Sequence, residues 1–276
     1  MKLIYVSKLY QRYKDFFMAN IVEIKGNIFE SSCKTIVNTI NCVGIMGKGI
    51  AFEYKHRFPD MYKSYLNLCE TNQLKPGLLQ LWKKSSPWIL NFPTKNHWKN
   101  PSKMEYIESG LKKFAVTYEE RVITSIAFPQ LGTSHGGLNW EDVRESMYKH
   151  LKPLANLDVE IYHFDPKAKD TFFDKLFRKI HRFDVTDYKT HLNIPKQQAK
   201  LIIDVLEPLK ESKDFNGEMI PPQEGEIKNN IHSMLELQNI KGVGEKTFEK
   251  IYTFVNSNQN NRLQTEGEIQ PSFKLE

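Results

Sequence analysis

The chain has 276 residues, 40% of them hydrophobic, and a mean hydropathy of −0.52, which are typical values for a soluble globular protein. No apolar run approaches the roughly 18 residues that a membrane span needs, and the apolar stretch near the N-terminus is too short for a secretory signal. We therefore expect a cytoplasmic protein that does not contact a membrane. The formal net charge of +6 is compatible with a polyanionic partner but does not establish one.

The predicted elements divide the chain into four parts. Residues 1–17 hold a short apolar stretch, 3–6, and are expected to be an N-terminal extension. Between residues 18 and 166, apolar strands and amphipathic helices alternate, which predicts a mostly parallel sheet covered by helices on both faces. The predicted strands are 21–24, 36–40, 78–82, 88–91, 122–128 and 159–163, and the predicted helices are 50–56, 59–70, 103–118 and 140–151. Ser102 is the expected N-cap of the third helix.

The strand pattern stops after Pro166. Residues 167–256 are expected to form a small helical region, with helices across 170–206, a long loop across 210–227 and helical character again from 229 to 254. Asn-Gly and Pro-Pro pairs mark the loop. The polar residues 257–276 predict a disordered tail. We find no internal repeat in the sequence.

Three polar loops follow predicted strands directly. The first, 41–49, contains three glycines, the second, 91–98, contains Lys95 and His97, and the third, 128–140, contains further glycines and His135. Because the carboxyl ends of parallel strands meet at one edge of a sheet, we expect the loops to form a single site. Backbone N–H groups in glycine loops and at helix N-termini bind phosphates. The loops therefore predict a site for a phosphorylated ligand.

Neither a metal nor a catalytic thiol is expected. Cys33, Cys42 and Cys69 lack the spacing of metal ligands and are predicted to be reduced thiols, although Cys42 lies in a candidate loop. The loops also contain no pair of His, Asp or Glu residues at ligand spacing. We therefore predict that the site uses no metal and no cofactor.

The motifs that point to a family are residues 25–30, 37–51, 92–98, 129–132 and 136–140. Their order and spacing resemble the macrodomain family, and most closely its branch of DNA ADP-ribosyl glycohydrolase antitoxins. This resemblance covers about residues 20–164. It implies a three-layer α/β/α fold around a mixed, mostly parallel sheet, a cleft for ADP-ribose and, as a partner, a cognate DNA ADP-ribosyltransferase toxin.

The resemblance also implies roles for particular residues. Asn27 and Ile28 would contact the adenine, whereas Asn38 and Asn41 belong to the expected catalytic set and would reach the distal ribose beside the bond to be broken. The other expected contacts to ADP-ribose come from the three loops: Gly44, Ile45, Met46, Gly47, Lys48, Gly49, Thr94, Gly132, Thr133, Ser134 and Gly136. The glycines among them would surround the diphosphate with backbone donors.

Lys95 is the expected catalytic residue, because related glycohydrolases use a lysine at this position. It would attack or stabilise the anomeric carbon; the alternative is that it only neutralises the diphosphate. His135 could transfer protons or only donate hydrogen bonds within its loop. Gly136 stands where relatives that act on ADP-ribosylated protein carry an aspartate, which argues against that branch. Trp98 either stacks on a base or on the distal ribose, or has no ligand role.

Residues 237–251 resemble a helix-hairpin-helix motif. Glycines in such a hairpin permit close approach to DNA, and the following helix N-terminus can hold a backbone phosphate regardless of sequence. The expected DNA contacts are Lys241, Gly242, Gly244 and Lys246. The alternatives are an ordinary glycine turn between two helices and, for the whole helical region, a surface that holds a toxin partner.

Together these features predict an enzyme that hydrolyses ADP-ribose from ADP-ribosylated DNA bases, an antitoxin-like glycohydrolase that acts on an N-glycosyl bond. One alternative is a macrodomain hydrolase that acts on ADP-ribosyl-protein or on ADP-ribose phosphate esters. The other is a non-catalytic ADP-ribose reader attached to a DNA-binding module. Lys95 favours an enzyme, whereas the glycine at position 136 keeps the reader as an alternative.

Overall fold

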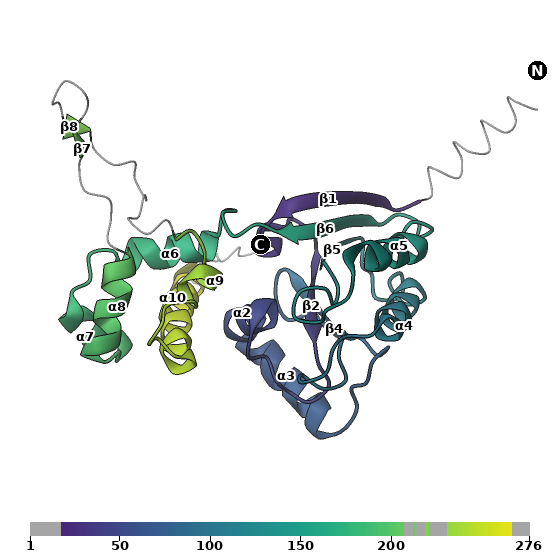
Figure 1. Cartoon of the computed structure of the whole chain (residues 1–276), viewed down its shortest axis with the longest axis horizontal. Coiled ribbons are helices and arrows are strands. Elements are labelled where there is room, and N and C mark those ends of the chain that lie inside the picture. Colours follow the sequence, from purple (N-terminus) through teal and green to yellow (C-terminus); the bar gives the residue numbers. More distant parts are fainter. Residues whose placement is uncertain (1–17, 207–211, 214–218, 221–230, 267–276) are drawn as a thin grey trace, which may run out of the picture. The chain divides into compact units, whose positions relative to one another are not determined.

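The computed structural model describes residues 18–206, 212–213, 219–220 and 231–266, and the chain divides into two compact units between Ala168 and Lys169 (Figure 1). The first is called the sheet unit and the second the helical unit. The extension predicted for residues 1–17 lies outside the described residues. No helix in the described part of the chain is both long and apolar enough to cross a membrane.

Six strands form one sheet in the sheet unit, in the order β1-β6-β5-β2-β4-β3. They are β1 (Asn20–Gly26), β2 (Thr35–Ile40), β3 (Gln80–Trp82), β4 (Trp88–Pro93), β5 (Ser125–Pro129) and β6 (Asp158–Phe164). Neighbouring strands are parallel except β3 and β4, which are antiparallel. This arrangement confirms the predicted mixed, mostly parallel sheet. It also brings the carboxyl ends of five strands to one edge.

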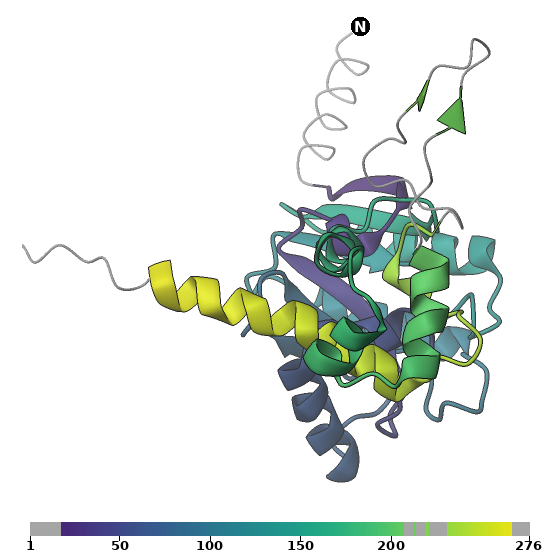
Figure 2. The ribbon, with the colours of Figure 1, turned by 90° about the vertical axis from the view of Figure 1, so that its left-hand side faces the viewer.

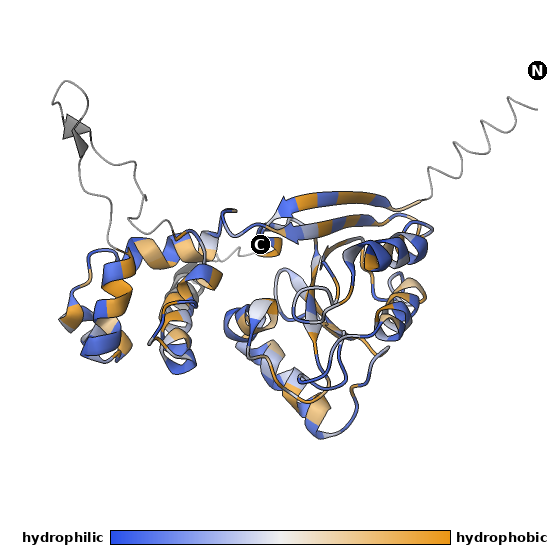
Figure 3. Ribbon diagram, viewed as in Figure 1, coloured by the Kyte–Doolittle hydropathy of each residue, from blue (hydrophilic) through white to orange (hydrophobic). Residues whose placement is uncertain are grey.

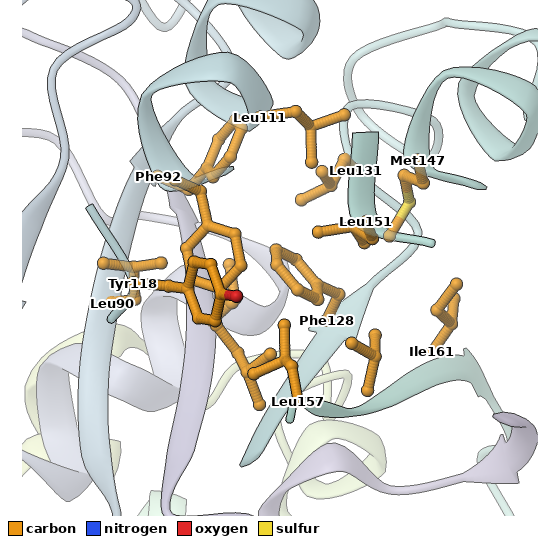
Figure 4. Close-up of a cluster of buried hydrophobic side chains, with 14 of the residues drawn as sticks. Leu90, Phe92, Leu111, Tyr118, Phe128, Leu131, Met147, Leu151, Leu157 and Ile161 are labelled. Atoms are coloured by element: carbon orange, nitrogen blue, oxygen red, sulfur yellow. The ribbon is translucent and has the colours of Figure 1, made fainter. Parts of the chain in front are cut away.

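Helices cover both faces of this sheet. One face packs against α2 (Gly49–Arg57) and α3 (Pro59–Glu70), and the other packs against α4 (Met104–Ala115) and α5 (Trp140–Leu151). Val37 and Leu90, paired in register, lie in the core on the α4 and α5 side, whereas their neighbours Ile36 and Ile89 lie on the other side. Figure 4 shows Leu90 within this core. A strand buried on both faces needs a nearly continuous apolar sequence, as β2 has. The three-layer fold is confirmed.

Two predicted boundaries are wrong. Helix α4 starts at Met104 with Lys103 in the N-cap position, so Ser102 does not cap it. The Ser102 side chain is instead buried, and its hydroxyl has no hydrogen-bond partner within the described part of the chain. Strand β5 begins at Ser125 rather than at residue 122, because Val122 has a φ of 60°, which a strand does not accommodate.

A charged cluster ties the edge strand β1 to β6 and α5. Strand β1 mixes hydrophilic and hydrophobic residues (Figure 3), and its Glu23 accepts hydrogen bonds from Arg144 Nε at 2.6 Å and from the Tyr148 hydroxyl at 3.0 Å. His163 Nε2 lies 2.7 Å from the other carboxylate oxygen. Burial raises the pKa of Glu23, but the hydrogen bonds from His163, Arg144 and Tyr148 outweigh burial and hold this pKa below its usual value.

The helical unit contains the helical region predicted after residue 166. Its helices are α6 (Thr171–Ile180), α7 (Val185–Leu192), α8 (Lys196–Leu206), α9 (Met234–Leu237) and α10 (Glu245–Glu266). Two features differ from the prediction: β7 (Ser212–Lys213) pairs with β8 (Met219–Ile220) inside the expected loop, and α10 continues through residues 257–266 of the expected disordered tail (Figure 2). Residues 267–276 of that tail lie outside the described residues.

Two hairpins of the helical unit share one backbone pattern. In each, a residue with positive φ stands three positions before the second helix: Asn193 (φ 52°) before α8 and Gly242 (φ 88°) before α10. The next residue is a buried aliphatic one in both hairpins, Ile194 and Val243. The structure therefore contains an internal repeat, which the sequence did not show.

Equivalent positions of the two hairpins contact each other. Thr247 and Gln198, each five residues after the positive-φ residue, form a hydrogen bond of 2.6 Å. The residues eight positions after each positive-φ residue contact the opposite hairpin. Lys250 donates to the Asn193 carbonyl, and Leu201 packs against Gly242. The two hairpins therefore contact each other through equivalent positions.

Glu23→Gln should lower the free energy of unfolding of the sheet unit by about 1–2 kcal/mol at pH 7, because Arg144 and His163 lose a charged acceptor. A carboxyl with a lowered folded-state pKa contributes stability above its unfolded-state pKa and loses it as the pH falls through the folded-state pKa. The difference in free energy of unfolding between wild type and Glu23→Gln should therefore shrink below about pH 4.

Urea unfolding followed by tryptophan fluorescence at several pH values measures this difference, since all four tryptophans precede residue 169. Glu105→Gln is the control, because Glu105 pairs with Lys103 in solvent and surface pairs contribute little. A difference that stays constant from pH 7 to pH 3 contradicts the assignment.

Candidate functional site

The carboxyl ends of the five parallel strands form one edge of the sheet, and the predicted loops start there. In strand order this edge carries residues 27–28 after β1, Phe164 at the end of β6, the β5 loop (130–137), the β2 loop (41–48) and the β4 loop (94–99). The structure therefore brings together the three loops that the sequence predicted to form one site.

The β1 end of the edge holds the residues predicted to contact adenine. Asn27 is 9% exposed, and its side-chain oxygen accepts a hydrogen bond from Phe29 N at 3.1 Å. Phe164 pairs in register with Gly26, the residue before Asn27, and is 51% exposed. Sequence reasoning missed Phe164, although an aromatic residue at a strand end was the available signal.

Asn41 holds the β2 loop in its conformation. Its side-chain oxygen accepts from Val43 N at 3.0 Å and Ile45 N at 3.3 Å, and its amide donates to the Ile45 carbonyl. The Tyr65 hydroxyl donates to the Asn41 carbonyl at 2.9 Å. The oxygen and the nitrogen of the Asn41 side chain thus both bond to backbone groups of the β2 loop. The Asn41 amide nitrogen has two N–H groups, so these bonds do not exclude a contact with the distal ribose, which stays a prediction.

Asn38 is fully buried and has one unsatisfied atom. Its amide donates to Asn91 Oδ1 at 2.8 Å, and Met46 Sδ lies 3.9 Å from the same nitrogen. The Asn38 side-chain oxygen has no hydrogen-bond partner within the described part of the chain. A buried acceptor without a donor costs about 1–3 kcal/mol. A ribose hydroxyl would satisfy this oxygen, but Asn38 has no exposed surface in the present conformation of the loop.

Lys95 joins the three loops. Its ammonium nitrogen donates to the His135 carbonyl of the β5 loop at 2.6 Å, and its backbone N–H reaches the Ile40 carbonyl at 3.4 Å. Cys42 N donates to the Asn96 carbonyl at 3.2 Å, which ties the β2 loop to the β4 loop. The partly exposed Lys95 side chain is therefore held at the junction of all three loops.

The β5 loop folds back so tightly that position 136 has no room for a side chain. Gly137 N donates to the Thr133 carbonyl at 2.7 Å, and Ser102 N donates to the Gly136 carbonyl at 2.9 Å. A Cβ atom on Gly136 would overlap the Gly132 carbonyl oxygen and the Ser102 hydroxyl. An aspartate at this position is therefore incompatible with this conformation of the loop.

The remaining predicted contacts differ in exposure. The exposed ones are Ile45, Gly47, Lys48, Ser134 and His135, those of intermediate exposure are Gly49, Gly132 and Thr133, and the buried ones are Ile28, Gly44, Met46 and Thr94. An added Cβ on Gly49 would lie 3.5 Å from the His135 ring, so this ring lies beside the start of α2. No side chain caps that helix end, which leaves its N–H groups for an anion.

The three loops of the edge carry positive but no negative side chains. Residues 36–52, 91–104 and 130–140 contain no aspartate or glutamate, whereas they include Lys48, Lys95 and Lys99. Burial, together with the neighbouring Cys69, raises the pKa of Cys42 to about 12, so this cysteine is a thiol rather than a nucleophilic thiolate at neutral pH. The edge suits an anionic ligand.

In the helical unit, all four residues predicted to contact DNA lie in the second hairpin and are exposed, namely Lys241, Gly242, Gly244 and Lys246. Gly242 requires its positive φ, and Leu201 packs against it. A Cβ on Gly244 would meet nothing within 4 Å, so a large partner can approach the backbone there closely.

Comparisons with known proteins agree with this architecture. The Macro domain family model matches residues 37–147. A curated relative, DNA ADP-ribosyl glycohydrolase of Thermus aquaticus, is 40% identical over 151 residues, which cover 52% of this chain and 42% of that protein. The chain thus spans about two fifths of the length of this relative.

Two solved structures match the sheet unit. The macrodomain of Thermus aquaticus DarG is 39% identical with a TM-score of 0.51, and the match covers 52% of this chain and 99% of that one. Thermosipho africanus DarTG in complex with ADP-ribose is 36% identical with a TM-score of 0.51, and the match covers 55% of this chain and 43% of that one. Nearly all of the Thermus macrodomain is matched, so the chain belongs to the macrodomain family.

Proposed function

We propose that the sheet unit binds ADP-ribose along its loop edge and hydrolyses the bond that joins ADP-ribose to a DNA base. The observation that carries this proposal is the position of Lys95, whose nitrogen lies at the junction of the β2, β4 and β5 loops. Similarity to the DNA ADP-ribosyl glycohydrolase of Thermus aquaticus supports the same reaction.

The order of the strands supports one orientation of the ligand. ADP-ribose is linear, with adenine at one end, the diphosphate in the middle and the distal ribose at the other end. Asn27, Ile28 and Phe164 would hold the adenine at the β1 end. The β2 and β5 loops and the start of α2 would surround the diphosphate with N–H groups, with Lys48 adding charge. The distal ribose would then lie at the β4 end, beside Lys95 and near Asn38.

Hydrolysis at this position breaks the bond between the anomeric carbon and the base nitrogen. The electron pair leaves with the base, a proton returns to the base nitrogen, and water supplies the hydroxyl group that ends on the ribose. The transition state resembles an oxocarbenium ion, so positioned polar groups matter more than a strong base. Lys95 would attack or stabilise this carbon, and the exposed His135 would move the proton.

The glycine at position 136 favours DNA over protein as the acceptor. Relatives that act on ADP-ribosylated protein carry a carboxylate in this loop, and here the Gly132 carbonyl and Ser102 occupy the space it would need. The cluster of loops without acidic residues also suits a nucleic acid better than an acidic protein side chain.

The helical unit would supply contact with DNA. Lys241 and Lys246 flank the exposed glycines of the second hairpin, as expected for a hairpin that holds a backbone phosphate. A cognate DNA ADP-ribosyltransferase is the proposed partner, because such an enzyme makes the substrate. In that antitoxin-like arrangement, the chain reverses the modification that the transferase introduces.

Lys95→Ala should slow the release of ADP-ribose from an ADP-ribosylated oligonucleotide by on the order of 100-fold or more, because the group beside the anomeric carbon is lost. Binding of free ADP-ribose should remain measurable by calorimetry. Lys95→Arg separates the two roles: it restores activity if only positive charge is needed, but not if an amine must attack.

ADP-ribosylated protein is the parallel substrate in this assay, with released ADP-ribose quantified by mass spectrometry. Full turnover by Lys95→Ala would contradict the catalytic role. Release from protein but not from DNA would favour the protein-directed hydrolase. ADP-ribose binding without release from either substrate would favour the reader.

Gly136→Ala should weaken ADP-ribose binding at least tenfold and destabilise the sheet unit by about 2 kcal/mol, because its Cβ forces the β5 loop open. Gly47→Ala is the control for stability, since a Cβ there meets only the Ile45 side chain at 3.8 Å. Thermal unfolding and calorimetry measure the two effects. Unchanged binding by Gly136→Ala would show that the loop adopts another conformation.

The double variant Lys241→Ala/Lys246→Ala should weaken binding of unmodified DNA and reduce the slope of log affinity against log salt by about 1–2, because two phosphate contacts are lost. Lys63→Ala/Lys112→Ala removes the same charge from the surface of the sheet unit and should leave the slope unchanged. Fluorescence anisotropy across a salt series gives both slopes, and equal effects of the two double variants would rule out a specific contact.

A further inference from the structure

Trp98 is a large exposed ring next to the proposed reaction site. It is 48% exposed and lies three residues after Lys95 in the β4 loop. The His97 ring stacks on it with centroids 5.8 Å apart and an interplanar angle of 25°, and Lys99 Nζ lies 5.2 Å from its centroid. Burial in the core does not explain an indole in this position.

The turn that carries Trp98 is held in place by its own hydrogen bonds. Asn100 N donates to the His97 carbonyl at 3.1 Å, and Lys99 N donates to His97 Nδ1 at 3.2 Å. The bond from Cys42 N to the Asn96 carbonyl attaches this turn to the β2 loop. The ring is therefore presented by a tied turn, which lowers the entropic cost of binding to it.

Exposed apolar side chains lie on the β2 loop that is tied to the Trp98 turn, and a positive charge lies on the turn itself. Val43 and Ile45, on the attached β2 loop, are 42% and 47% exposed. Lys99 is exposed, and residues 91–104 contain no acidic side chain that could pair with it. The proposed sites for the diphosphate and for the anomeric carbon do not use Lys99, so its charge is available for a further anionic group.

We propose that Trp98 and Lys99 form a subsite for the nucleotide next to the modified base, with its base stacked on Trp98 and its phosphate at Lys99. This inference rests on the proposed function, because it requires that the group beyond the distal ribose is DNA. A base can stack on a protein ring only after it leaves its own stack, so the subsite favours a single strand. The pair is therefore specificity-determining and does not take part in breaking the bond.

The test compares two substrates that carry the same adduct: an ADP-ribosylated mononucleotide and a single-stranded oligonucleotide of roughly ten nucleotides. Trp98→Ala should lower the ratio of kcat/KM for the oligonucleotide to kcat/KM for the mononucleotide about tenfold, whereas Trp98→Phe should keep most of this ratio. Lys99→Ala should reduce the salt dependence of kcat/KM on the oligonucleotide by a slope of about 0.7. Lys63→Ala, a distant surface lysine, is the matched control for charge.

Equal loss on both substrates, or an unchanged ratio, would overturn the subsite. If the proposed function itself is wrong, the outcome is different, because the wild type would then release ADP-ribose from neither substrate. In that case, fluorescence anisotropy measures how tightly the Lys95→Ala variant binds the modified mononucleotide and the modified oligonucleotide, with and without Trp98→Ala. A preference for the oligonucleotide that Trp98→Ala removes supports the subsite, and its absence overturns it.

Discussion

Hydrogen bonds to main-chain carbonyls, together with the parallel strands, hold the three loops of the candidate site against one another. Lys95 donates to the His135 carbonyl, and Cys42 N donates to the Asn96 carbonyl. The parallel strands bring the loops to one edge, but these bonds determine which groups face each other there. Lys95, the proposed catalytic residue, is thus positioned by the same contact that connects the β4 loop to the β5 loop.

Close packing in the β5 loop limits the chemistry available at this edge. With Gly132 and Ser102 occupying the space around Gly136, no carboxylate can stand at that position. The groups that remain there include lysines, histidines, backbone N–H donors and the buried side-chain oxygen of Asn38, which has no hydrogen-bond partner within the described part of the chain. In the proposed function, the N–H donors of this set would bind the phosphates of ADP-ribose, and Lys95 would act at the anomeric carbon.

The fold followed from the sequence because alternating strands and helices leave few arrangements for a parallel sheet. The six predicted strands and the four helices around them are present, and the loops meet as expected. Predictions for single side chains were less successful. Ser102 lies under the β5 loop instead of capping α4, because the partners of a polar group depend on segments far away in the chain. Residue type and spacing do not reveal such partners.

The internal repeat of the helical unit was hidden for a related reason. The two hairpins share a positive-φ residue, a buried aliphatic residue and a helix start, but Asn193-Ile194-Pro195 and Gly242-Val243-Gly244 have no residue in common. Backbone conformation and burial are repeated, whereas amino-acid identity is not. The repeat became visible only through the reciprocal contacts between equivalent positions.

A crystal structure of the Lys95→Ala variant with an ADP-ribosylated oligonucleotide tests the central claim most directly, because the variant should bind the substrate without cleaving it. The account predicts adenine beside Asn27 and Phe164, the diphosphate across the β2 and β5 loops, and the anomeric carbon next to position 95. Adenine at the β4 end, or a ligand bound away from the carboxyl ends of the strands, would contradict it.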